Sequence, residues 1–162
     1  MVLFNLRVKN AVRRMLRISK LTDYAIMVMV ELSQSRGEVI SAQALAERCG
    51  LELPTVSKLL KLLTRSELVQ SFRGVNGGYR VNRPSADISV AEVIAAIEGP
   101  IAMTECSIDT GLCQQEDNCN LRSNWQRISL AVAEAMQQVT LAEMARPAPA
   151  VTDSLKIATF NA

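Results

Sequence analysis

Three cysteines, Cys106, Cys113 and Cys119, lie within fourteen residues of one another in a chain of 162 residues that contains no histidine. They form no Cys-x-x-Cys pair, which zinc ribbons and thioredoxin-type redox motifs require. Thiolates are soft ligands that favour iron–sulfur clusters, zinc or copper(I). The wide spacing, in a loop that contains Gly111, favours a cluster. A three-thiolate zinc site with an oxygen ligand and a thiol–disulfide switch are the alternatives.

Three sulfur ligands leave one coordination position to be filled. Because the chain has no histidine, the fourth ligand must be a carboxylate, a small thiol, water or a group from a second subunit. The remaining cysteine, Cys49, stands apart at the end of a predicted helix. A small apolar side chain is the ordinary requirement there, so we assign Cys49 to the core.

Composition and charge favour a polyanion-binding protein without catalytic machinery. An apolar content of 49% supports a real core, and no apolar run approaches the ~20 residues that span a bilayer, so we expect a cytoplasmic protein without a membrane partner. Residues 1–80 carry 13 Lys or Arg against 6 Asp or Glu, whereas residues 81–162 carry 5 against 10. We predict no enzyme and no small-molecule substrate, since no phosphate-binding loop or triad motif is present.

The positions of the apolar residues predict a helix-turn-helix in the basic half. A first helix is expected from Thr22, as its N-cap, to Ser35, and a second over residues 42–49 with Ser41 as its cap. After a glycine turn, Pro54 opens a third helix that runs to about Arg65. Two short helices around a tight turn are typical of this DNA-binding motif.

A β-hairpin is predicted directly after these helices, over residues 68–73 and 79–81 with a glycine turn between them. In this position the hairpin is the wing of a winged helix. Arg73, the best candidate in the wing, and Arg80 flank the turn, so they can meet phosphates or enter a minor groove. In the third helix, the predicted DNA contacts are Thr55, Ser57 and Lys58 in the major groove and Lys61 and Arg65 at phosphates. At the start of the second helix, Ser41 and Gln43 are predicted to contact the DNA backbone.

The acidic half, residues 81–162, is predicted to hold the cysteine loop and a helix that pairs two subunits. Ser89 starts a capping box and a helix that ends near Gly99, and the cysteine loop follows. From Leu121 to Val139 apolar residues recur every three or four positions, which indicates a long helix that pairs subunits; packing on its own domain alone is the alternative. Thr140 caps a last short turn.

The expected fold is mainly α: a winged helix-turn-helix with a two-stranded β wing, plus a long C-terminal dimerisation helix. Four segments are expected. They are a basic extension, either an arm or the result of a start at Met15 (1–14), the DNA-binding domain (15–84), the cluster loop with the dimerisation helix (85–146), and a disordered tail (147–162).

Several segments together resemble the Rrf2 family of winged-helix regulators. They are RISKLTDYA at 17–25, SFRGVNGGY at 71–79, the three-cysteine loop, Asn124-Trp125 and TLAE at 140–143. Within the family the chain is similar to the IscR type, and especially to regulators of the SUF iron–sulfur assembly operon. The resemblance covers residues 15 to about 145. It implies a homodimer that binds double-stranded operator DNA and carries a [2Fe-2S] cluster, ahead of [4Fe-4S], on Cys106, Cys113 and Cys119.

One position departs from the IscR-type pattern. Arg122 stands where that pattern has a ligating histidine, and a guanidinium stays protonated and does not ligate iron. Relatives that sense nitric oxide or redox state use an acidic residue near the amino terminus of the partner subunit, and Asp23 occupies the matching place. The resemblance therefore implies Asp23 as the fourth ligand across the dimer. Glu105, which lies beside Cys106 in the sequence, is the second candidate.

The sequence thus predicts an iron–sulfur-dependent transcriptional repressor of suf- or isc-type assembly genes. A nitric oxide or redox sensor of the same family is the nearest alternative. A redox or electron-transfer protein in which the winged helix serves as a docking module is the alternative of another class.

Overall fold

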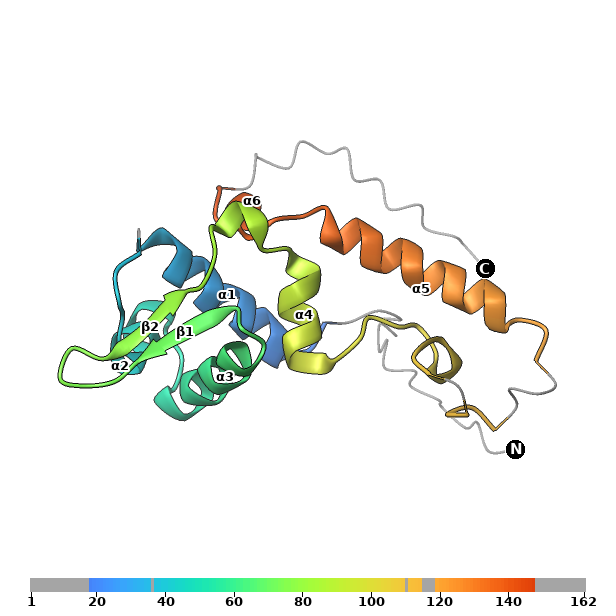
Figure 1. Ribbon diagram of the computed structural model, residues 1–162, viewed down its shortest axis with the longest axis horizontal. Coiled ribbons are helices and arrows are strands. Elements are labelled where there is room, and N and C mark those ends of the chain that lie inside the picture. Colours follow the sequence, from blue (N-terminus) through green and yellow to red (C-terminus); the bar gives the residue numbers. More distant parts are fainter. Residues whose placement is uncertain (1–17, 36, 110, 115–118, 148–162) are drawn as a thin grey trace, which may run out of the picture.

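The structure, a computed structural model, describes residues 18–35, 37–109, 111–114 and 119–147 (Figure 1). It is mainly helical with one two-stranded antiparallel sheet, as predicted. Its elements are α1 (Lys20–Gln34), α2 (Ala42–Cys49), α3 (Leu53–Arg65), β1 (Val69–Phe72), β2 (Gly78–Val81), η1 (Ser85–Asp87), α4 (Val90–Glu98), η2 (Glu105–Ser107), α5 (Arg122–Gln137) and α6 (Leu141–Met144). The predicted extension (1–14) and nearly all of the predicted tail (147–162) lie outside the described residues.

The first helix begins earlier than predicted. Its N-cap is Ser19, whose side chain accepts a hydrogen bond from the backbone N–H of Thr22. Thr22, which we had predicted as the cap, is instead a buried residue of the first turn, and its hydroxyl donates to the carboxylate of Glu98. Both residues have capping side chains, and the tertiary contact with α4 decides which of them caps.

The apolar faces of α1, α2 and α3 meet in one core, to which β1, α4 and α6 add side chains. The largest fully buried side chains include Met29 and Leu32 of α1, Leu45 of α2 and Leu59 of α3. Cys49 packs against this core, as predicted. Burial raises the pKa of its thiol, and the nearby Glu31 carboxylate raises it further, so Cys49 has the environment of an unreactive thiol.

The wing is seated against the segment that leads into α2. Ile40 and Tyr79 exchange two backbone hydrogen bonds, of 2.9 and 2.8 Å. A side chain at Gly78 would prevent this approach, because its Cβ would lie 2.4 Å from the carbonyl oxygen of Ile40. The glycine therefore does more than allow a turn: it lets the hairpin dock on the helix-turn-helix.

Helices α4 and α6 start side by side. Ser89 and Thr140 are the N-caps of two capping boxes and form an isolated antiparallel bridge. The backbone N–H of Leu141 donates to the carbonyl of Ile88 at 2.8 Å, and the Leu141 side chain is fully buried. The short last helix is thus an anchor that returns the chain to the core after α5.

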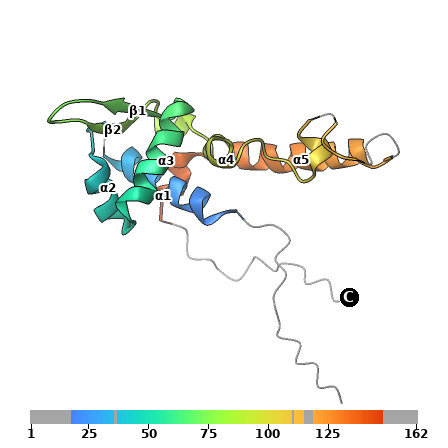
Figure 2. The same ribbon diagram turned by 90° about the horizontal axis from the view of Figure 1, so that it is seen from below.

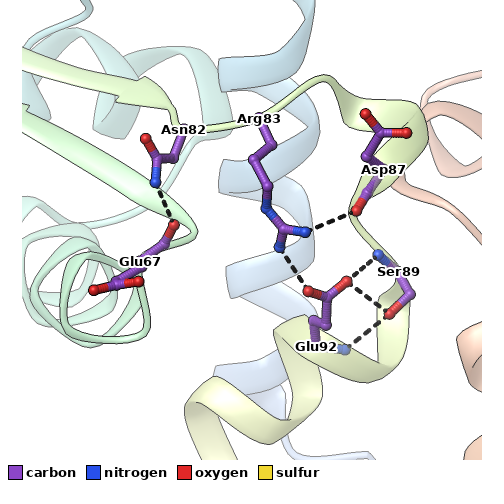
Figure 3. Close-up of polar contacts among 6 residues, drawn as sticks. All are labelled: Glu67, Asn82, Arg83, Asp87, Ser89 and Glu92. Carbon is purple, nitrogen blue, oxygen red and sulfur yellow. Dashed lines mark hydrogen bonds and ion pairs between the residues drawn. The ribbon is translucent and has the colours of Figure 1, made fainter.

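Polar contacts fix the exit of the wing to the start of α4 (Figure 3). Arg83 donates to the carbonyl oxygen of Asp87 at 3.1 Å and to the Glu92 carboxylate at 2.6 Å, while Glu92 also completes the capping box with Ser89. Burial would raise the pKa of Glu92, but the hydrogen bonds from Ser89 and Arg83 and the charge of Arg83 hold it below its ordinary value.

Helix α5 runs away from the winged-helix core, and the segment after α4 lies beside it (Figures 1 and 2). Only Ser129 of α5 is buried, and the helix contacts α4 and η2. Its predicted apolar stripe is present but largely uncovered, with Leu121, Trp125 and Ile128 exposed.

We expect Gly78→Ala to lower the free energy of unfolding by about 1–3 kcal/mol, because the added methyl group forces the wing away from Ile40. Urea unfolding followed by circular dichroism measures the change. Val75→Ala, at a fully exposed position of the same hairpin, is the control and should leave stability unchanged. Equal stability of Gly78→Ala and the native chain would contradict the docking role of this glycine.

Candidate nucleic-acid interface and cysteine loop

Helix α3 presents a polar face opposite its buried one. Val56, Leu59, Leu60 and Leu63 are buried in the core. Of the predicted DNA-contact residues on this helix, Ser57, Lys58, Lys61 and Arg65 are exposed, and Thr55 is half-buried. A helix with a buried apolar stripe and exposed hydroxyl and ammonium groups has the side chains that the major groove and its phosphates require.

The two predicted contacts on α2 lie at its N-terminus. Ser41 accepts a hydrogen bond from the backbone N–H of Ala44 at 3.1 Å, and exposed Gln43 donates to Glu47 at 2.8 Å. The Ser41 hydroxyl therefore serves first as a helix cap, and it can donate its own proton to a phosphate while accepting from Ala44.

The wing arginines have different surroundings. Arg73 is exposed just after β1. Arg80, within β2, is half-buried; its guanidinium carbon lies 4.9 Å from the centroid of the Phe72 ring, and its Nη2 lies 3.2 Å from Oε1 of Gln70. The sequence predicted both arginines beside the turn. It did not reveal that the guanidinium of Arg80 contacts Phe72 and Gln70.

The cysteine loop runs from the end of α4 to the start of α5. Cys106, in η2, is 6% exposed, and its sulfur lies 3.3 Å from the hydroxyl oxygen of Thr104. Cys113 and Cys119 are half-buried, and all three are free thiols. Within the described ranges no three cysteine, aspartate or glutamate side chains lie close enough to share a metal ion. The structure therefore does not gather the three predicted ligands into a preformed site.

The base of the loop is fixed to α5. The backbone N–H of Met103 donates to the hydroxyl of Ser129, at 2.9 Å, and thereby satisfies the hydroxyl of this buried serine. A half-open cleft of about 510 Å³ lies beside this contact and is lined by apolar side chains that include Ile94, Ile101 and Val132. A movement of the loop at Met103 would therefore displace or break its hydrogen bond with α5.

The two carboxylates predicted as a fourth ligand are both exposed: Asp23 in the first turn of α1, and Glu105 beside Cys106. A third carboxylate, Glu98, lies at the end of α4 and binds the start of α1. It accepts from the backbone N–H of Ser19, at 3.2 Å, and from the Thr22 hydroxyl. Sequence reasoning missed Glu98, because nothing in its local pattern reports a partner more than seventy residues away.

Comparison with known proteins identifies the family. Residues 18–147 match the family model described as Rrf2, iron-dependent transcriptional regulator. The chain belongs to the Rrf2 family. It is 34% identical over 131 residues to the HTH-type transcriptional regulator IscR of Sodalis glossinidius, covering 80% of this chain and 78% of that one.

Solved structures of Rrf2 proteins share the fold. T. potens IscR is 30% identical with a TM-score of 0.57, over 80% of this chain and 85% of that one. CymR, the global cysteine regulator of B. subtilis, is 29% identical with a TM-score of 0.62, over 80% of this chain and 96% of that one. The protein is a transcriptional regulator and not an enzyme, as predicted. No described helix is long and apolar enough to cross a membrane.

Loss of the Glu98 contact should remove part of the acid sensitivity of the fold. The hydrogen bond from Thr22 lowers the pKa of Glu98, burial opposes this, and the bonds from Ser19 lower it further. A carboxyl with a lowered folded-state pKa contributes stability above its unfolded value, near 4.5, and loses it as the pH falls through the lowered pKa.

We therefore expect Glu98→Gln to be less stable than the native chain at neutral pH, with a difference that shrinks below about pH 4.5. Urea midpoints measured at a series of pH values test this. Glu134→Gln, at an exposed position on α5, is the control. A difference between Glu98→Gln and the native chain that does not change with pH would contradict the contact.

Proposed function

We propose that this Rrf2 regulator is a homodimer that carries an iron–sulfur cluster and represses genes for iron–sulfur cluster assembly. The observation that supports the proposal most is the loop that carries three free cysteines, Cys106, Cys113 and Cys119. This loop lies between α4, which packs against the winged-helix core, and the exposed helix α5. Similar proteins also have other roles, since CymR is named for cysteine regulation.

The donor set fits a cluster by its chemistry. Three cysteines without a histidine supply soft thiolates, which iron–sulfur clusters prefer. When bound, the cluster would supply a group whose presence depends on iron and sulfide. Cys106, which is buried, and Cys113 and Cys119, which are half-buried, would hold the cluster. We place the cluster as [2Fe-2S] ahead of [4Fe-4S].

The fourth ligand that we propose is Asp23 of the second subunit, with Glu105 as the alternative. Asp23 is exposed and can therefore be reached by another chain. It follows Thr22, which binds Glu98 at the end of α4. A ligand at this place would link the cysteine loop of one subunit to the first helix of the other.

The second candidate function is a nitric oxide or redox sensor of the same architecture. Two features favour it: Arg122 stands in place of a histidine, and Asp23 is available as the acidic ligand.

The exposed apolar side chains of helix α5 support the proposal of a dimer. Leu121, Trp125 and Ile128 share one face and are 37–56% exposed, at the start of and within a helix that its own chain covers only in part. An apolar surface of this kind is stabilised by burial against a second copy. A dimer would present two copies of α3 and the wing to two operator half-sites. We propose that the protein acts in the cytoplasm, where its operator DNA lies.

We expect protein purified without oxygen to show visible charge-transfer absorption, with iron and acid-labile sulfide in matching amounts. Cys106→Ser should lose this absorption, whereas Cys49→Ser, the matched control in the core, should keep it. Asp23→Ala should alter the spectrum or shorten the lifetime of the cluster, and Glu105→Ala tests the alternative ligand. A colourless protein that resists cluster reconstitution would contradict the proposal and favour zinc or a thiol switch.

We expect Ile128→Glu to convert the dimer into monomers, because it places a charge within the apolar surface of α5. Sedimentation velocity on the full chain measures the change. Gln126→Glu adds the same charge at an exposed polar position on the same helix and should remain dimeric. A native chain that sediments as a monomer, or an Ile128→Glu variant that stays dimeric, would place the interface elsewhere.

A further inference from the structure

We propose that Arg80 is a phosphate-binding residue whose guanidinium is held in place, before DNA binds, by Phe72 and Gln70. These two act as positioning residues. The inference rests on the proposed function, because it assumes that the winged helix binds duplex DNA, but it does not depend on the cluster.

The register of the hairpin creates the arrangement. Gln70 lies opposite Arg80, and Phe72 lies opposite Gly78. Because Gly78 has no side chain, nothing from the facing position covers the Phe72 ring. Arg80, two residues further along β2, extends over this ring, at 4.9 Å from its centroid, while Gln70 accepts a hydrogen bond from its Nη2.

The guanidinium lies on the face of the hairpin that is turned away from the core. Side chains alternate between the faces of a strand. Tyr79 and Val81, the neighbours of Arg80 in β2, pack against the core. Arg80, Gln70 and Phe72 share the other face, where a ligand can reach them.

The charge of Arg80 is uncompensated in the described part of the chain. Arg48 and Arg83 each form an ion pair, at 3.3 Å with Glu31 and at 2.6 Å with Glu92. Arg80 instead contacts an aromatic ring and a neutral amide. Both partners restrict its rotation without neutralising it, and one acceptor leaves most of its five N–H donors free.

The position of Arg80 favours a phosphate over a base. The turn, residues 73–77, forms the tip of the hairpin, and Arg80 lies two residues into β2, roughly 7 Å behind the start of that strand at 3.3 Å per residue. When the tip enters a groove, a side chain at this depth meets the sugar–phosphate rim. A guanidinium ordered in advance loses less conformational entropy on binding than the exposed Arg73.

The test uses the full chain and two fluorescent duplexes, one selected from random sequence by the native protein and one of mixed sequence. Arg80→Ala should weaken binding to both duplexes by the same factor. It should also reduce the slope of log K against log salt by about 1.8 for the dimer, because each of the two protomers loses one phosphate contact worth about 0.9. Phe72→Leu and Gln70→Ala should each weaken binding severalfold in the native chain and have no effect in the Arg80→Ala background.

Two variants keep the test interpretable. Phe72→Tyr retains a ring and should bind as the native chain does, and Arg80→Lys retains the charge but should lose most of the affinity. Unchanged affinity and salt slope in Arg80→Ala, additive effects of Phe72→Leu and Arg80→Ala, or a loss confined to the selected duplex would each overturn the inference. A native chain that selects no duplex from random sequence and does not bind the mixed-sequence duplex would instead overturn the proposed function.

Discussion

The structure depends on the fixation of α4 at both ends. At its start, Glu92 completes a capping box and pairs with Arg83 at the exit of the wing. At its end, Glu98 accepts hydrogen bonds from Ser19 and Thr22 at the start of α1. Between these contacts, Val93 and Ile94 are buried in the core. The wing, the first helix and the cysteine loop are therefore joined through one short helix.

This arrangement gives the cysteine loop two mechanical connections. One runs back through α4 to the DNA-binding domain, and the other runs through the Met103–Ser129 hydrogen bond to α5. A ligand can change DNA affinity only if it binds two conformations of the protein differently. A loop that adjoins both the DNA-binding domain and the proposed dimer helix is placed where ordering of its cysteines would favour one conformation.

Local patterns predicted most of the fold. The capping boxes at Ser89 and Thr140, the wing and the helical periodicities are short-range signals, and they gave the correct elements. Long-range contacts decided the rest: Thr22 could not be recognised as buried, because its partner Glu98 lies far away in the sequence. The cysteines were recognisable by type and spacing, but the distances between them depend on the path of a loop that no local rule describes. The contacts of Arg80 follow from the strand register, in which Gln70 lies opposite Arg80. The predicted hairpin placed Gly78 in the turn and did not give this register.

The measurement that tests the account most directly is the affinity of the full chain for its selected duplex in two forms, cluster-loaded and cluster-free, at one salt concentration. The account predicts that the two forms differ by at least severalfold, and that Cys106→Ser binds as the cluster-free form does under either preparation. Equal affinity of the loaded and cluster-free forms would contradict it, since the cysteine loop would then have no influence on DNA binding.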